Sequence, residues 1–133
     1  MIPAWVGAWI LTSAVSANNP DVPRVYSRAT RQISSSDSTV TIVDDLVRVR
    51  GGVVHLEWTG KLDGADYPVE GVEIYLTSAY RQVDDHTLEL TQKVDGRPVV
   101  RARMVLSPDG QTITTETTDG ITTTTTVYRK GGT

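Results

Sequence analysis

The stretch AWVGAWILTSAVSANNP, residues 4–20, decides the fold because it supports two incompatible interpretations. An apolar run ending in Ala-Val-Ser-Ala is typical of a secretion signal with a small-residue cleavage site. The same residues could instead form the first strand of a β-barrel. A signal normally begins with basic residues, yet none precedes this run, which Gly7 also interrupts. Trp5 and Trp9 are better explained as core side chains, so we predict a strand over residues 6–12.

Length and charge exclude several classes of protein. The chain has 133 residues and a formal net charge of -3, with its basic residues scattered. This length predicts one domain, residues 1–133, with a single core. Without a basic patch we expect no nucleic-acid partner, and the longest apolar run is too short to span a bilayer, so we expect no membrane insertion. The chain lacks cysteine, which excludes disulfides and thiolate metal sites. We expect a cytoplasmic monomer or homodimer, or a secreted protein if residues 1–17 are a cleaved signal.

Turn dipeptides rich in Gly and Asp punctuate the chain from residue 25 onward. Both residues tolerate the positive φ that tight hairpins require. Runs rich in Val, Ile, Thr and Tyr separate them, and no helical period persists long enough for a helix. The second run contains Asp44-Asp45, which interrupts its alternation and predicts a β-bulge. The predicted strands cover residues 25–34, 39–50, 53–62, 72–83, 87–94, 98–107, 112–118 and 121–130.

The regular spacing of these strands predicts an antiparallel meander. Closure into a barrel removes the exposed edges that an open meander would leave. Residues 6–12 add a ninth strand. We therefore predict an all-β fold, a single antiparallel up-and-down β-barrel of 8–10 strands, with an interior that can hold one small ligand.

Several motifs carry a resemblance to a known superfamily. Gly7-Ala8-Trp9 matches the Gly-x-Trp signature that opens the first strand of lipocalins and fatty-acid-binding proteins, and Thr126-Val127-Tyr128-Arg129-Lys130 resembles the last strand of the latter. The segments at residues 57–69, 83–89 and 107–110 resemble small bacterial lipocalin-like proteins. Over most of residues 5–130 the chain thus resembles the lipocalin-like, or calycin, superfamily. The resemblance implies that Trp9 is a structural plug beneath a cation, Arg129 or Lys130.

Two departures from the fatty-acid-binding proteins affect the expected ligand. Their Arg-x-Tyr pair, which holds a carboxylate, is Thr126-x-Tyr128 here, and residues 13–24 cannot contain their helical lid. A fatty acid is therefore a poor first expectation. Arg103 falls near a position where that family has an interior arginine and could replace the missing cation, although the apolar pattern around it favours an outward arginine.

Strand alternation predicts which side chains line the interior. If Tyr128 points inward, Thr126 and Thr124 do too, and an apolar face from Ile74 and Leu76 continues into polar residues. Aromatic surfaces with a few polar groups are typical of a small-molecule pocket. A plain packed core is the alternative for the same residues. The predicted ligand-binding residues are Trp58, Ser78, Tyr80, Gln82, Arg103, Thr124, Thr126 and Tyr128.

The sequence contains no phosphate loop, metal-ligand spacing or nucleophile elbow, and we predict no metal site and no cofactor. His55 is expected on the outer face and His86 in a turn. The predicted function is binding of a small, largely apolar molecule. The alternative is a cofactor-independent cyclase or isomerase of the natural-product type, with Tyr80, Gln82 and Tyr128 as catalytic candidates. A third interpretation is a packed barrel that acts as an interaction module through its outer surface.

Overall fold

The structure of the protein is a computed structural model that describes residues 3–16 and 26–131. A 3-10 helix, η1, precedes ten strands that form one closed barrel. The elements are η1 Pro3–Trp5, β1 Gly7–Ser16, β2 Tyr26–Ser36, β3 Thr39–Arg48, β4 Val53–Gly60, β5 Tyr67–Glu70, β6 Leu76–Asp84, β7 Thr87–Val94, β8 Arg97–Leu106, β9 Thr112–Thr118 and β10 Thr123–Lys130.

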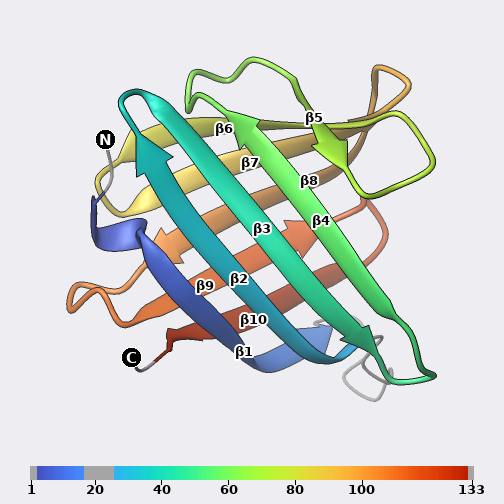
Figure 1. Ribbon diagram of the computed structural model, residues 1–133, viewed down its shortest axis with the longest axis horizontal. Helices are drawn as coiled ribbons and strands as arrows, with labels where there is room; N and C mark the ends of the chain where they lie inside the picture. The colour runs from blue at the N-terminus through green and yellow to red at the C-terminus, as the bar shows by residue number, and fades with distance from the viewer. Residues whose placement is uncertain (1–2, 17–25, 132–133) are drawn as a thin grey trace.

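Every strand pairs antiparallel with its neighbour in the chain, and β1 also pairs with β10, which closes the barrel (Figure 1). The predicted up-and-down barrel of 8–10 strands is confirmed, and residues 6–12 fall largely within β1. One strand, β5, was not predicted. Its four residues are too few for alternation to stand out, and Pro68 within them argues against a strand because proline cannot donate to the ladder.

The predicted bulge at Asp44-Asp45 is wrong. The pairing of β3 with β4 advances residue by residue from Val40 to Val47, without a shift in register. The two aspartates therefore follow the ordinary alternation of a strand, in which neighbouring side chains point to opposite faces. Asp44 points into the barrel and Asp45 points out of it.

Two tryptophans close one end of the barrel, which we call the plugged end. Trp5 and Trp9 are fully buried. The indole nitrogen of Trp9 donates to the Trp5 carbonyl oxygen at 2.9 Å, and that of Trp5 donates to the Asp85 carbonyl oxygen at 3.0 Å. Because η1 supplies Trp5, the segment before β1 is part of the closure.

The cation over the plug is Lys130, whose Nζ lies 5.5 Å from the centre of the Trp9 ring. The expectation of Arg129 in this position is wrong. The register explains the choice, because Lys130 lies opposite Trp9 on the paired strand, whereas Arg129 lies opposite the outward-pointing Ile10 and is exposed. Lys130 thus provides the cation–π contact that the resemblance implies.

No helix within residues 3–16 and 26–131 has the length and apolar character needed to cross a lipid bilayer.

Candidate functional site

The barrel interior changes character along the strands. Inward side chains nearest the plugged end are buried and fill the space between the strands; they include Ile33, Ile42, Trp58, Leu88, Met104 and Ile113. Farther along the same strands, inward side chains retain accessible surface, namely Leu46, Leu56, Leu90, Val100, Thr117 and Thr126. An inward side chain with accessible surface borders space that no neighbour fills. We call this second part of the interior the open half.

An ion pair lies inside the barrel where the packed core meets the open half. Arg31 on β2 and Asp44 on β3 are direct cross-strand partners, and Nε of Arg31 donates to Oδ1 of Asp44 at 2.8 Å. Their side chains are only 16% and 17% exposed. The guanidinium also lies 5.0 Å from the centre of the Tyr128 ring. Arg31 is therefore held by a carboxylate and by an aromatic face at once.

The surroundings shift the pKa values of Arg31 and Tyr80. Burial on its own would lower the pKa of the Arg31 guanidinium, but Asp44 and the two tyrosines raise it above its ordinary value, so Arg31 stays charged. Burial raises the pKa of the Tyr80 hydroxyl to about 12, and the charge of Arg31 opposes this shift only in part. Tyr80 is consequently a neutral phenol at physiological pH, able to donate a hydrogen bond.

Other uncharged polar groups face the same space. Ser78 is buried, and its hydroxyl accepts a hydrogen bond from Nε2 of Gln92 at 3.3 Å. Thr115 on β9 is an inward residue that lies opposite Thr126 of β10. Its Oγ1 is buried and has no hydrogen-bond partner in the part of the chain that the structure describes. A buried hydroxyl without a partner costs free energy.

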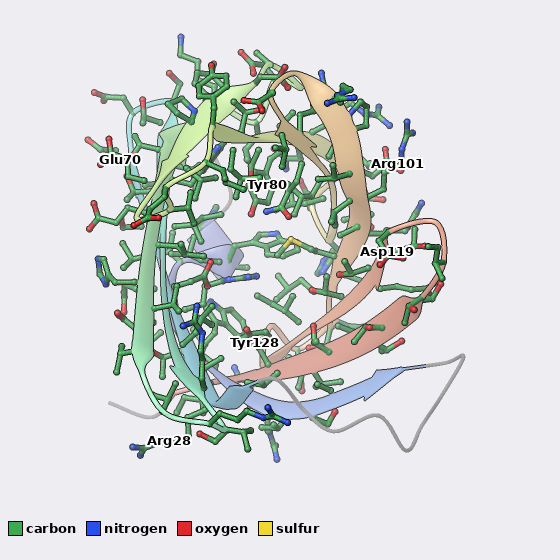
Figure 2. The ribbon with its side chains drawn as sticks, turned by 90° about the vertical axis from the view of Figure 1, so that its right-hand side faces the viewer. Arg28, Glu70, Tyr80, Arg101, Asp119 and Tyr128 are labelled. Carbon is green, nitrogen blue, oxygen red and sulfur yellow. The ribbon has the colours of Figure 1, made fainter. Side chains whose placement is uncertain are left out.

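The structure brings most of the predicted site residues to this interior. Tyr80 and Tyr128 are buried and lie within the ring of strands, whereas Arg101 and Glu70 project from its outer side (Figure 2). Trp58 is also buried inside, where its indole donates to the Ser78 carbonyl oxygen at 2.9 Å and its ring centre lies 4.6 Å from that of Tyr80. Thr124 and Thr126 are half-buried at inward positions of β10, in the open half.

Two predicted residues lie apart from this group. Nε2 of Gln82 donates to the Asp84 carbonyl oxygen at 3.4 Å, beside the β6–β7 turn at the plugged end. Ile74, expected on the inward face, is 56% exposed because it precedes β6 in the open-end loop.

The hypothesis that Arg103 supplies an interior cation is wrong. Its side chain is 59% exposed on the outer face, with its Nη1 3.7 Å from a carboxylate oxygen of Glu89. Ala102 and Met104, on either side of Arg103 in β8, are buried and point inward, so alternation directs Arg103 outward. The interior cation is Arg31.

Sequence reasoning missed Arg31, Asp44, Thr115 and Gln92. The signal for the first two was present: Arg31 falls between Ala29 and Ile33, and Asp44 continues the apolar positions Val40 and Ile42. Strict alternation would therefore have placed both charges inside. An isolated charge is expensive to bury, so the pattern becomes credible only once the two residues are known to be cross-strand partners.

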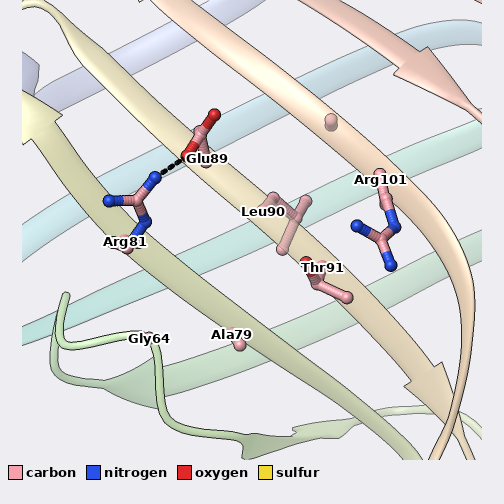
Figure 3. Close-up of a pocket in the computed structure, with 8 residues that line it drawn as sticks. Gly64, Ala79, Arg81, Glu89, Leu90, Thr91 and Arg101 are labelled. Atoms are coloured by element: carbon pink, nitrogen blue, oxygen red, sulfur yellow. Dashed lines mark hydrogen bonds and ion pairs between the residues drawn. The ribbon is translucent and has the colours of Figure 1, made fainter.

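The outer face carries a separate hollow of about 280 Å³ across β6, β7 and β8. Arg81, Glu89 and Arg101 line it, with Gly64 of the β4–β5 loop at its edge (Figure 3). Arg81 is ion-paired to Glu89. Two of these three charged side chains already neutralise one another on the solvent-exposed face. This hollow is therefore a weaker candidate for a ligand site than the barrel interior.

The closed, up-and-down antiparallel barrel has a lipocalin-like fold. Among solved structures it is similar to a mutant form of the fluorescent protein UnaG, with a TM-score of 0.71, 17% sequence identity and full coverage of both chains. It is also similar to a REP1-NXSQ fatty acid transporter, with a TM-score of 0.70, 12% identity and 96% coverage of each chain. A third similar structure is a Schistosoma mansoni fatty acid binding protein in complex with arachidonic acid, with a TM-score of 0.69, 16% identity and 98% coverage of each chain.

At these identities the likeness concerns the fold. No protein-family model and no curated protein matches the sequence.

Proposed function

We propose that the protein binds a small, largely apolar molecule in the open half of its barrel. The observation that carries this proposal is the contrast between the two parts of the interior, one filled and one lined by inward side chains that retain accessible surface. Leu46, Leu90 and Val100 offer apolar surface for the body of a ligand. Enclosed apolar walls with a few polar groups are the usual composition of such sites.

The polar groups of the interior include the buried side chains of Ser78, Tyr80 and Tyr128. Tyr80, Tyr128 and Ser78 would contact the polar end of the ligand, with Thr124 and Thr126 on the adjoining wall. Two of the similar structures are named for fatty acids, which supports an apolar ligand without specifying its polar group.

The alternative function is that of a cofactor-independent cyclase or isomerase. The observation that favours it is the protonated Tyr80 phenol beside the Arg31–Asp44 pair, since a neutral donor in a desolvated site can polarise a carbonyl group. Both functions would use the same part of the barrel interior. A carrier would release its ligand unchanged, whereas an enzyme would release a converted product.

Native mass spectrometry of the purified protein, followed by denaturing extraction, tests the binding function. We expect a bound apolar compound, or a rise in melting temperature with members of an apolar compound library. Recovery of an added compound unchanged indicates a carrier, and its conversion indicates an enzyme. An empty protein that no library member stabilises would contradict both functions and favour an interaction module.

Adjacent residues of β8 provide a matched pair of variants. Val100 points inward, and Val99, at the register shift between β7 and β8, is 40% exposed. Val100→Trp should fill the open half and abolish binding, whereas Val99→Trp should leave it intact. Equal binding by both variants would place the ligand outside the barrel.

A further inference from the structure

We propose that the barrel selects a neutral ligand, whose polar group is a hydroxyl, carbonyl or amide, and discriminates against carboxylates. This inference rests on the proposed function, because it specifies the chemistry of a molecule bound in the open half. It is argued from the balance of charge inside the barrel, from the partners that Arg31 already has, and from the uncharged groups around it.

The two charges of the inner ion pair cancel. Arg31 and Asp44 are bonded to one another on the inner face, and their side chains are 16% and 17% exposed. On the outer face, Arg81 and Arg103 pair with Glu89. A ligand that contacts the inner pair therefore meets one positive and one negative charge.

Arg31 already has an anionic partner. Its Nε is bonded to Asp44 at 2.8 Å, and its guanidinium lies near the Tyr128 ring. A ligand carboxylate that approached Arg31 would also approach the Asp44 carboxylate. Two carboxylates in a site with little solvent repel one another, and one cation cannot compensate both.

The interior also carries uncharged hydrogen-bonding groups, of which Tyr80 interacts with Arg31. The Tyr80 hydroxyl remains protonated, and Oγ1 of Thr115, whose residue is 7% exposed, has no partner within the described residues. The Thr126 hydroxyl lies on the paired strand opposite Thr115. Groups of this kind complement a neutral hydroxyl or carbonyl, and a site built to bond such a group rejects molecules that cannot satisfy it.

The test compares three probes with the same hydrocarbon chain: a saturated long-chain fatty acid, the corresponding primary alcohol and the methyl ester. Each competes with an environment-sensitive apolar dye for the purified protein near neutral pH. For the wild-type chain we expect the alcohol and the ester to bind at least about tenfold more tightly than the acid. Tighter or equal binding of the acid overturns the inference.

Variants of neighbouring aspartates assign the selectivity to the ion pair. Asp44→Asn removes the internal negative charge and keeps the side-chain shape, so affinity for the acid should rise at least about tenfold while affinity for the alcohol changes little. Asp45→Asn makes the same chemical change on the outer face and should leave selectivity unchanged. The double variant Arg31→Gln/Asp44→Asn restores neutrality and should again prefer the alcohol.

The outcomes separate this inference from the function on which it rests. If Asp44→Asn folds but does not gain affinity for the acid, the inference is overturned. If that variant does not fold, the wild-type comparison decides alone. Equal binding of all three probes overturns the selectivity and leaves the binding function standing, whereas failure of the dye and of every probe to bind overturns both.

Discussion

Two arginine–carboxylate pairs lie on opposite faces of the barrel sheet, one between β2 and β3 and the other between β6 and β7. Arg31–Asp44 is inside, with both side chains less than one-fifth exposed, and Arg81–Glu89 is outside, with side chains 62% and 37% exposed. Each pair joins neighbouring antiparallel strands at directly opposed positions. The two pairs are thus alike in chemistry and in strand geometry, and they differ in how far water reaches them.

The comparison teaches that the side of the wall determines the energetic role of a pair. Outside, water screens the charges and competes for their hydrogen bonds, so formation of the pair changes stability little. Inside, each charge depends on the other, since neither could be buried alone without a large penalty. The inner pair therefore constrains the interior and whatever binds there, while the outer pair contributes mainly to solubility.

The largest effect is expected at the plug, where Trp9 is buried on the inner face and its neighbour Ile10 is exposed on the outer face. Trp9→Ala should lower the free energy of unfolding by about 3 to 5 kcal/mol, because it creates a cavity and removes the hydrogen bond to the Trp5 carbonyl. Ile10→Ala, at the next residue of β1 and 49% exposed, is the control and should cost far less. Denaturant unfolding measures both, and equal losses would contradict the assignment of Trp9 as the plug.

The two ion pairs supply the next effect. Arg31→Met leaves Asp44 as an unpaired charge inside the barrel and should cost about 3 kcal/mol, whereas Arg81→Met should cost less than about 1 kcal/mol. Adding Asp44→Leu to Arg31→Met should recover part of the loss, because the double variant buries no charge. These values come from chemical unfolding at neutral pH. A double variant less stable than Arg31→Met would show that the pair is not the cause.

Tyr80 sharpens the comparison at alkaline pH. Its pKa is raised from the ordinary 10.0 to about 12, chiefly by burial. In the unfolded chain the phenol loses its proton first, so this contribution to stability is fully present below about pH 10 and is lost as the pH rises from there to about 12, on the order of 2 to 3 kcal/mol.

Tyr80→Phe should lessen that loss between the two pH values. The pKa of Tyr67 is also raised, by burial first and by its hydrogen bond to Asp63. Spectrophotometric titration of tyrosinate should therefore show the late phase become smaller in Tyr80→Phe and stay unchanged in Tyr75→Phe, since Tyr75 is 62% exposed. A Tyr80 that titrates with the exposed tyrosines would place its hydroxyl in water.

The smallest effect is expected on the outer face at His55. Hydrogen bonds to Asp45 first, and then to Glu57, raise the pKa of this imidazole above its ordinary value of 6.5. The contribution to stability is present below pH 6.5 and is lost as the pH rises through the raised pKa of the folded state. Because the group is exposed, His55→Gln should alter the melting temperature only slightly, and only below the raised pKa of the folded state. NMR titration of the imidazole checks the direction, and a pKa that Asp45→Asn fails to lower would contradict the cause.

Local patterns were sufficient for most of the architecture. Gly and Asp at the turns and alternation between them predicted the strands, and the Gly7-Ala8-Trp9 motif predicted which end is closed. Tyr80 and Trp58 followed from alternation as inward residues, and Tyr128 followed from the resemblance. The four-residue β5 gave too short a signal, and its existence depends on pairing with β4 and β6 on either side.

The sequence by itself determined the all-β class and the order of most strands, because these depend on the conformational preferences and alternation of neighbouring residues. The aromatic plug followed from the Gly7-Ala8-Trp9 resemblance. Only the tertiary structure decided that Lys130 covers Trp9, that Arg103 points outward and that Arg31 meets Asp44 inside the barrel. Those outcomes depend on the register between strands and on whether a partner lies across the ladder. Burial of a charge is set by that partner, and the partner lies thirteen residues away along the chain.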